Sequence, residues 1–128
     1  LTRELCHIDW NDSTKNIYNL IRGLSPYPTA YTELLAADTE VPVQLKIFSA
    51  EKMELESPCT PGTVLSDGKS YLAIATADGA ISIKDLQLAG KKRMDVKSFL
   101  LGFRDPDTYR CTAGTSKSVL DSVLPSSR

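Results

Sequence analysis

Hydrophobic residues recur at helical spacing in an early part of the chain. The residues of this stripe are Ile17, Leu20, Ile21 and Leu24, at positions i, i+3, i+4 and i+7. Asp12 or Ser13 can cap the start of a helix here, because their side-chain oxygens accept the free N–H groups of a first turn. Gly23, Pro26 and Pro28 are typical of a helix end. The pattern therefore predicts one helix ahead of the remaining elements.

The pattern then changes to the two-residue period of a half-buried strand. The alternating residues are Val43, Leu45 and Ile47 on one face and Gln44, Lys46 and Phe48 on the other. Two Asp-Gly pairs, at 67–68 and 78–79, separate β-rich runs further along. Asp-Gly is typical of hairpin turns, where it supplies positive φ values. We therefore expect a meander of strands near residues 62–66, 70–76 and 80–87.

A short helix is predicted to close the domain. Asp95 can cap its start, and Val96, Phe99 and Leu100 fall on its inward face. One helix, four or five short antiparallel strands and a closing helix predict a mainly β fold. We expect a small, partly open OB-like barrel.

The length of 128 residues leaves room for one domain and one core. The composition is 41% hydrophobic and 24% charged, which is ordinary for a globular protein. We assign residues 1–110 to the barrel and expect residues 111–128, rich in serine and threonine, to form a mobile tail. No run of 18 apolar residues is present, so no membrane span is expected.

The start of the chain, LTRELCHIDW, carries Glu4 and Asp9 and lacks the apolar stretch of a signal peptide. It also lacks an initiator methionine, and we therefore expect a fragment of a longer protein. Cys6, Cys59 and Cys111 are odd in number and widely spaced, which argues against a disulfide framework. A reducing compartment, the cytoplasm, is expected.

The chain contains a single histidine, His7. Ser-His-Asp and Cys-His arrangements would both have to use it, although it lies at the chain start among apolar neighbours. Tetrahedral zinc needs four ligands, so the adjacent Cys6 and His7 cannot form a metal site by themselves. We expect no catalytic residue and no metal in this chain.

Gly68, Lys69 and Ser70 have the G-K-S ending of a phosphate-binding loop. That motif needs a glycine where Thr63 stands, and its loop opens a helix rather than a strand. A hairpin turn is the favoured interpretation.

Charge is distributed unevenly along the chain, although the formal net charge is −1. Residues 32–57 hold six acidic residues against Lys46 and Lys52, whereas residues 88–104 hold five basic residues against Asp95 alone. The densest run is Lys91, Lys92 and Arg93. Such a run is either a solvated loop or a contact with an anionic partner.

Five segments together resemble a known family. They are HIDW (7–10), IRGLSPYPTAYT (21–32), LKIFSAE (45–51), PGTVL (61–65) and TADGAISIKDLQLAGKKRMDVKSFLLG (76–102). In this order they are similar to the carboxy-terminal domain of bacterial methionyl-tRNA formyltransferases. The resemblance covers roughly residues 1–110, and the tail lies outside it.

The resemblance implies a function. Enzymes of this family transfer a formyl group from 10-formyltetrahydrofolate to the methionine amino group of initiator tRNA. Catalysis and binding of the cosubstrate belong to a Rossmann-like amino-terminal domain, which has no counterpart here. The carboxy-terminal domain is an OB-like barrel that helps to hold tRNA. We therefore expect this chain alone to bind no cofactor and to be inactive, with initiator tRNA and the amino-terminal domain as its partners.

The candidate tRNA-binding residues are Lys91, Lys92, Arg93, Arg22 and Lys46. Each has a structural alternative: a solvated loop for the run of three, an offset to the helix dipole for Arg22, and a polar strand face for Lys46.

Three large aromatic side chains are expected to pack within the protein. Tyr27 and Tyr31 are expected in the core or at the barrel rim rather than as platforms for bases, and Trp10 should fold back onto the helix stripe.

An alternative function remains at this stage. The barrel could brace the catalytic domain of a related formyltransferase, acting on an amino sugar nucleotide or on formyltetrahydrofolate itself, and bind no RNA. The basic run favours tRNA binding, and the near-neutral net charge favours the brace.

Overall fold

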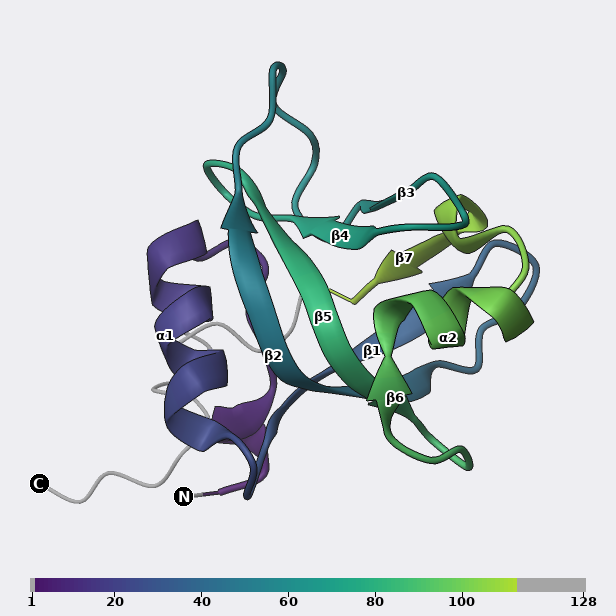
Figure 1. Cartoon of the computed structure of the whole chain (residues 1–128). Helices are drawn as coiled ribbons and strands as arrows, with labels where there is room; N and C mark the ends of the chain where they lie inside the picture. Colours follow the sequence, from purple (N-terminus) through teal and green to yellow (C-terminus); the bar gives the residue numbers. More distant parts are fainter. Residues whose placement is uncertain (1, 113–128) are drawn as a thin grey trace, which may run out of the picture.

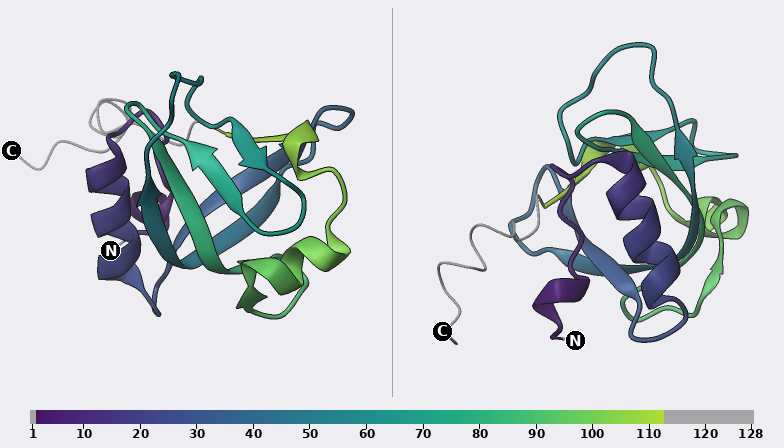
Figure 2. Two further views of the ribbon diagram at one scale, coloured as in Figure 1. Left: turned by 45° about the horizontal axis from the view of Figure 1, so that its top comes forward. Right: turned by 90° about the vertical axis from the view of Figure 1, so that its left-hand side faces the viewer.

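The computed structural model describes residues 2–112 as a strongly curved antiparallel sheet with two helices packed on it (Figures 1 and 2). The sheet has the order β3-β4-β5-β2-β1-β7, and β6 pairs with β5. The strands are β1 (Ala30–Ala36), β2 (Val43–Met53), β3 (Val64–Ser66), β4 (Leu72–Ala75), β5 (Ala80–Leu88), β6 (Met94–Asp95) and β7 (Tyr109–Cys111). All pairs between these strands are antiparallel. The predicted OB-like, mainly β barrel is confirmed, including the meander that becomes β3, β4 and β5.

The barrel is nearly closed where the end of β7 meets the segment before β3. The N–H of Cys111 donates to the carbonyl of Gly62 at 2.8 Å, and Thr63 forms a bridge with Arg110. Gly62 has φ +93, and a Cβ at this position would lie 2.7 Å from the carbonyl oxygen of Cys111. Only glycine combines this backbone conformation with so close an approach.

Helix α1 (Thr14–Leu24) follows the predicted stripe. Ile17, Ile21 and Leu24 are buried, and the helix packs against β2, β5 and β1 (Figure 2). Of the two predicted caps, Ser13 takes the N-cap position and accepts the N–H of Asn16. The helix ends one residue after Gly23, before the prolines.

The turn between β4 and β5 differs from the prediction, because Gly79 does not have a positive φ. Glycine is needed there for another reason: a Cβ would lie 2.9 Å from the carbonyl oxygen of Met53 and 3.0 Å from the Thr14 hydroxyl. Asp78 in the same turn accepts the N–H of Thr14 at 2.9 Å. A side chain from the sheet therefore helps to cap α1.

The turn between β3 and β4 is the predicted hairpin, with Gly68 at φ +77. The Asp67 carboxylate accepts the hydroxyl of Ser70 and the N–H groups of Lys69, Ser70 and Tyr71. These hydrogen bonds, the Ser70 hydroxyl first, hold the pKa of Asp67 well below its ordinary value. The N–H groups of Lys69 and Ser70 are thus taken by the Asp67 carboxylate, and that of Gly68 donates to the Ser66 hydroxyl, unlike in a phosphate-binding loop.

Strand β1 was not predicted, yet it carries central core residues. Ala30, Thr32 and Leu34 are buried on its inner face. Trp10 is fully buried, and its indole N–H donates to the Thr32 hydroxyl at 2.8 Å. The core therefore contains Trp10 as expected, with a partner on β1 that the helix stripe does not supply.

The predicted closing helix is α2 (Val96–Gly102), capped by Asp95. Val96, Phe99 and Leu100 are buried as predicted. Beyond it, the ring of Phe103 lies 4.7 Å from the rings of both Phe99 and Tyr109. This aromatic chain connects α2 to the short helix Pro106–Thr108 and to β7.

The predicted boundary at residue 110 falls inside β7. Cys111 is buried, and burial raises the pKa of its thiol to about 12. Thr112 donates its N–H to the carbonyl of Glu33 at 3.0 Å. The first two residues of the expected tail therefore belong to the sheet, because they complete the pairing with β1 and the contact with Gly62. Residues 113–128, and the mobility expected for them, lie outside the described part of the chain.

Candidate nucleic-acid interface

Lys46 lies in the middle of a row of side chains on the outer face of the sheet. Leu45 and Ile47 are buried, so alternation along β2 directs Lys46 outward. The register places Lys46 between Tyr31 of β1 and Gln87 of β5. Lys46 is half-buried and takes part in no ion pair among residues 2–112.

Two hollows flank Lys46, and both are lined by Gln44 and Lys46. The first has a volume of 280 Å³ and is also lined by Arg3, Tyr27, Thr29 and Tyr31. The second has a volume of 270 Å³ and reaches the hairpin between β5 and β6 through Gln87, Leu88, Ala89 and Gly90. We call the two hollows together the Lys46 groove.

Arg3 is a cation of the groove that sequence reasoning missed. The segment before α1 forms a bridge between His7 and Tyr31, which brings residues 3–7 alongside β1. The Arg3 guanidinium lies 5.1 Å from the centroid of the Tyr31 ring, within cation–π range. No local pattern in the sequence predicts the pairing of His7 with Tyr31.

His7 also stacks on Tyr31, with its ring centroid 4.8 Å from that of the tyrosine. Burial lowers the pKa of His7 from 6.5, and this effect outweighs the Glu33 carboxylate 3.6 Å away, which raises it. The imidazole is therefore neutral at pH 7, and its contact with Glu33 is not an ion pair at that pH. His7 adds an aromatic surface to this corner rather than a charge.

The run of three cations divides into two parts. Arg93 donates through Nε and Nη2 to Asp85 Oδ2, at 2.9 and 2.6 Å, and its guanidinium lies 4.0 Å from the Phe48 ring centroid. The hydrogen bond to Asp85 raises the pKa of Arg93, and the carboxylate offsets its charge. Arg93 thus attaches the hairpin to the sheet.

Lys91 and Lys92 are the exposed cations of this hairpin. They belong to none of the ion pairs found in residues 2–112. The Gln87 side chain donates to the carbonyl of Lys91 at 3.0 Å, which holds the turn beside the second hollow. Both residues directly follow Gly90, which lines the second hollow.

Arg22 lies apart from the groove, in the last turn of α1. Its guanidinium is 5.5 Å from the Tyr18 ring centroid, and the ammonium of Lys52 is 5.2 Å from the same centroid. Arg3 and Lys46 line the groove, Lys91 and Lys92 follow Gly90 at its end, and Arg22 has a different set of neighbours.

Tyr27 is not in the core, contrary to expectation. Its side chain is 86% exposed at the edge of the first hollow. The turn that follows α1 carries it outward, between Pro26 and Pro28. Tyr31 is half-buried between strands and fits the predicted rim position.

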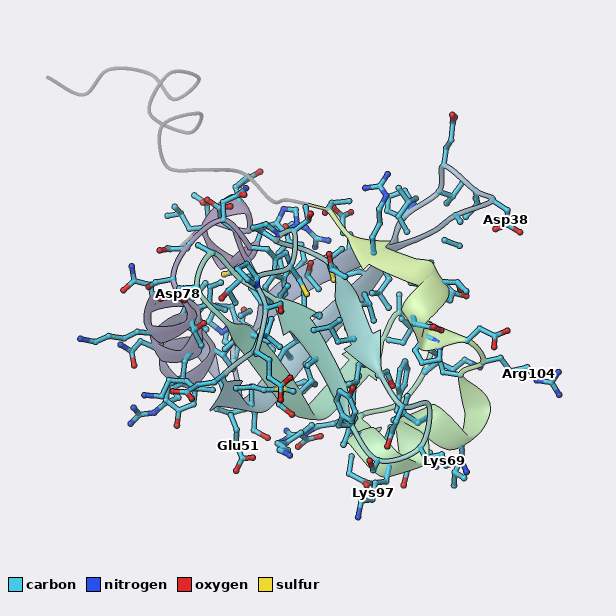
Figure 3. The ribbon with its side chains drawn as sticks, turned by 90° about the horizontal axis from the view of Figure 1, so that it is seen from above. Asp38, Glu51, Lys69, Asp78, Lys97 and Arg104 are labelled. Carbon is cyan, nitrogen blue, oxygen red and sulfur yellow. The ribbon has the colours of Figure 1, made fainter. Side chains whose placement is uncertain are left out.

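Other charges lie elsewhere on the surface. Lys69, Lys97 and Arg104 gather on the α2 side, and Asp38 and Glu51 lie on different sides of the molecule (Figure 3). The basic and acidic stretches of the sequence therefore do not form two opposite faces. Within the basic stretch, Lys91 and Lys92 follow a residue that lines the groove, while Lys97 and Arg104 line neither of its hollows.

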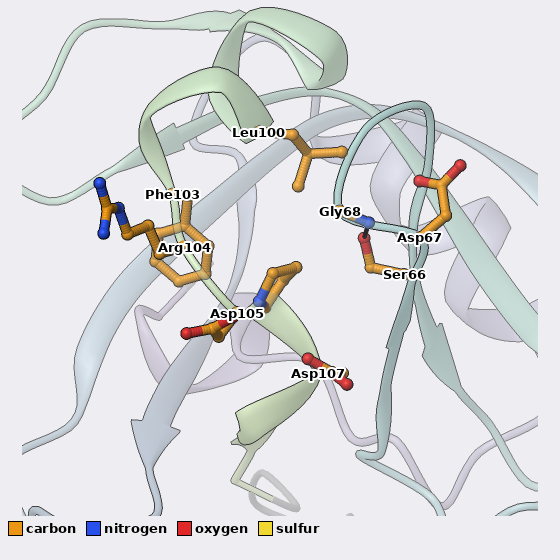
Figure 4. A pocket seen from close by; sticks show the side chains of 9 residues that line it. Ser66, Asp67, Gly68, Leu100, Phe103, Arg104, Asp105 and Asp107 are labelled. Carbon is orange, nitrogen blue, oxygen red and sulfur yellow. Dashed lines mark hydrogen bonds between the residues drawn. The ribbon is translucent and has the colours of Figure 1, made fainter.

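A larger hollow of 440 Å³ lies between the β3–β4 turn and the segment after α2 (Figure 4). Asp67, Asp105 and Asp107 line it together with Arg104, so carboxylates outnumber the single cation. This balance disfavours a polyanion such as RNA.

Residues 2–112 contain no cluster of three His, Cys, Asp or Glu side chains suited to a metal ion. Neither α1 nor α2, the α-helices of the described part, has the length and apolar character needed to cross a bilayer.

Comparison with known proteins gives consistent similarities. A family model described as the formyl transferase C-terminal domain matches residues 1–104. The chain is 48% identical over 107 residues to a methionyl-tRNA formyltransferase of Parabacteroides distasonis, covering 84% of this chain and 33% of that protein. It is 50% identical over 108 residues to the corresponding protein of Phocaeicola vulgatus, with the same coverage. The chain thus spans about a third of the length of these relatives.

A solved structure is similar at the level of the fold. HypX from Aquifex aeolicus, in complex with tetrahydrofolic acid, aligns with a TM-score of 0.59 and 24% identity. The match covers 80% of this chain and 17% of the HypX chain. At this identity the likeness supports the barrel architecture alone.

Proposed function

Because the chain belongs to the formyl transferase C-terminal domain family, we propose that it is the tRNA-holding domain of a methionyl-tRNA formyltransferase. Formyl transfer from 10-formyltetrahydrofolate, and the binding of that cosubstrate, belong in this proposal to an amino-terminal domain of the same protein. The domain described here contributes affinity and position for initiator tRNA during translation initiation in the cytoplasm.

The observation that carries the proposal is a groove lined and flanked by cations that have no ion-pair partner among residues 2–112. Arg3 and Lys46 line the first hollow, Lys46 also lines the second, and Lys91 and Lys92 directly follow Gly90, which lines the second. Cations along a groove bind nucleic-acid backbone by releasing condensed counterions. Since phosphate spacing is the same in every sequence, the groove orients tRNA without reading its bases.

The tyrosines are compatible with this role. Tyr27 and Tyr31 face the same hollow as Arg3 and Lys46. OB-like barrels that bind single-stranded nucleic acid combine cationic grooves with aromatic rings. A barrel that serves only as a brace has no need for cations along this groove.

The proposal is tested by the salt dependence of tRNA binding. In the triple variant Lys46→Ala, Lys91→Ala and Lys92→Ala, the slope of log affinity against log salt should flatten by about two to three, at about 0.7–0.9 for each phosphate that is no longer neutralised. The matched control is Lys15→Ala, Lys69→Ala and Lys97→Ala, which removes the same number of exposed cations outside the groove.

The control variant should keep the slope of the unmodified chain. If both triple variants lower the affinity equally, only net charge matters, and the groove is not the binding surface. If neither changes the slope, the barrel does not hold tRNA backbone, and bracing of the catalytic domain becomes the better account.

A further inference from the structure

Tyr27 is presented by a turn that holds its backbone in place. Pro26 and Pro28 restrict φ on both sides of it. Thr29 is buried, its N–H donates to the carbonyl of Leu24 at 2.9 Å, and its hydroxyl donates to the carbonyl of Pro26 at 2.6 Å. These contacts fasten the turn to the end of α1, while the ring of Tyr27 remains 86% exposed.

The backbone of Thr29 is strained in this turn. Its φ is +80, in the left-handed region that β-branched residues avoid. Strain of this kind costs free energy and persists where the surrounding structure enforces it, often at binding sites. The turn thus combines an unfavourable backbone conformation at Thr29 with an exposed side chain at Tyr27.

The ring borders the first hollow of the Lys46 groove, next to two cations. Arg3 and Lys46 line this hollow together with Tyr27 and Tyr31. None of the nine residues that line it is leucine, isoleucine, valine, methionine or phenylalanine. Two tyrosines and two cations therefore share one hollow, which is the combination that stacks bases and neutralises phosphates in single-stranded nucleic-acid sites.

We propose that the first hollow binds one unpaired nucleotide of RNA, with its base stacked on Tyr27 and its phosphate held by Arg3 and Lys46. This inference rests on the proposed function and adds a second kind of contact to it. A base inside a duplex already has neighbours on both faces, whereas an unpaired base offers a free face to an aromatic ring. The hollow therefore distinguishes RNA with an unpaired nucleotide from a continuous duplex, while remaining tolerant of base identity.

The test uses the 128-residue chain and two RNAs with one stem. One is a blunt hairpin, and the other carries a short unpaired 3′ overhang. The unmodified chain should bind the overhang RNA more tightly. In Tyr27→Ala the affinity for the overhang RNA should fall about fivefold or more, since stacking contributes about 1–3 kcal/mol per base, and the affinity for the blunt hairpin should not change.

Two matched variants distinguish the contribution of the aromatic ring of Tyr27 from those of its apolar bulk and its hydroxyl. Tyr27→Phe keeps the ring and should bind like the unmodified chain, whereas Tyr27→Leu keeps apolar bulk without a π-face and should behave like Tyr27→Ala. Because Tyr27 is exposed, all three variants should melt at the temperature of the unmodified chain.

Several results would overturn the inference. Equal weakening of both RNAs by Tyr27→Ala would make Tyr27 a backbone contact, and no weakening of either would leave salt-dependent backbone binding without a nucleotide site. If Tyr27→Ala instead weakens only the association with the amino-terminal domain added in trans, the ring is a protein contact. If the unmodified chain binds neither RNA, the proposed function itself fails.

Discussion

Trp10 and Thr32 share a hydrogen bond inside a core that is otherwise apolar. Both side chains are fully buried, and the indole N–H lies 2.8 Å from the Thr32 hydroxyl. Thr32→Val keeps the shape but leaves the indole donor without a partner, so the free energy of unfolding should fall by about 1–3 kcal/mol in chemical denaturation. Thr32→Ser restores a hydroxyl and should recover part of the loss. A larger loss for Thr32→Ser than for Thr32→Val would mean that methyl packing, not the hydrogen bond, matters.

The free energy of unfolding should depend on pH through His7. Arg3, Asp9 and Glu33 act on it, but burial is the largest effect and lowers its pKa below 6.5 in the folded state. The unfolded chain therefore binds a proton first as the pH falls through about 6.5, and the folded state loses stability below that pH. Denaturation between pH 7.5 and about 5 should show a decreasing free energy of unfolding.

His7→Gln should flatten this decrease, because the chain has no other histidine. The Asp67, Asp78 and Asp95 carboxyls have pKa values below their ordinary 3.8, so they lose their contribution only at lower pH. A decrease of the same size in His7→Gln would assign the pH dependence to another group.

At the scale of elements, the closure of the barrel depends on one glycine. Gly62→Ala must adopt a left-handed backbone, which costs about 1–2 kcal/mol, and must also relieve a 2.7 Å approach to the carbonyl of Cys111. Gly68→Ala is the matched control, because its φ is +77 and no described atom lies within 4 Å of the added Cβ. Thermal unfolding should show a clearly larger loss for Gly62→Ala. Equal losses would mean that the close approach relaxes freely.

Elements with strong local signals were predictable from the sequence. The stripe of α1, the alternation of β2 and the Asp95 cap of α2 are set by neighbouring residues, and the structure has all three. β1 was missed because its inner face consists of Ala30, Thr32 and Leu34, and Leu35 beside them blurs the alternation. β7 was missed because it depends on pairing with β1 and on Gly62, which are distant in sequence.

At the scale of the whole molecule, the site was predictable only in part. Lys46, Lys91 and Lys92 follow from charge pattern and family resemblance; Lys46 lines the groove, and Lys91 and Lys92 follow Gly90 at its end. Arg3 and Tyr27 could not be assigned, since one depends on the bridge between His7 and Tyr31 and the other on the turn at Thr29. Neighbouring cations in the sequence can also have different roles, because Arg93 pairs with Asp85 whereas Lys91 and Lys92 belong to none of the ion pairs found in residues 2–112.

Residue-resolved mapping of tRNA contacts tests the proposed interface most directly, because tRNA is proposed to bind one face of the barrel. The amide resonances of this 14.0 kDa chain should be followed by NMR while initiator tRNA is added. We predict that shifts and broadening centre on Arg3 and on residues 27–31, 44–48 and 87–92, and weaken as salt is raised. Changes centred on the hollow between Asp67 and Arg104, or on the outer face of α1 around Tyr18, or no changes at all, would contradict the assignment of the Lys46 groove as the tRNA-binding surface.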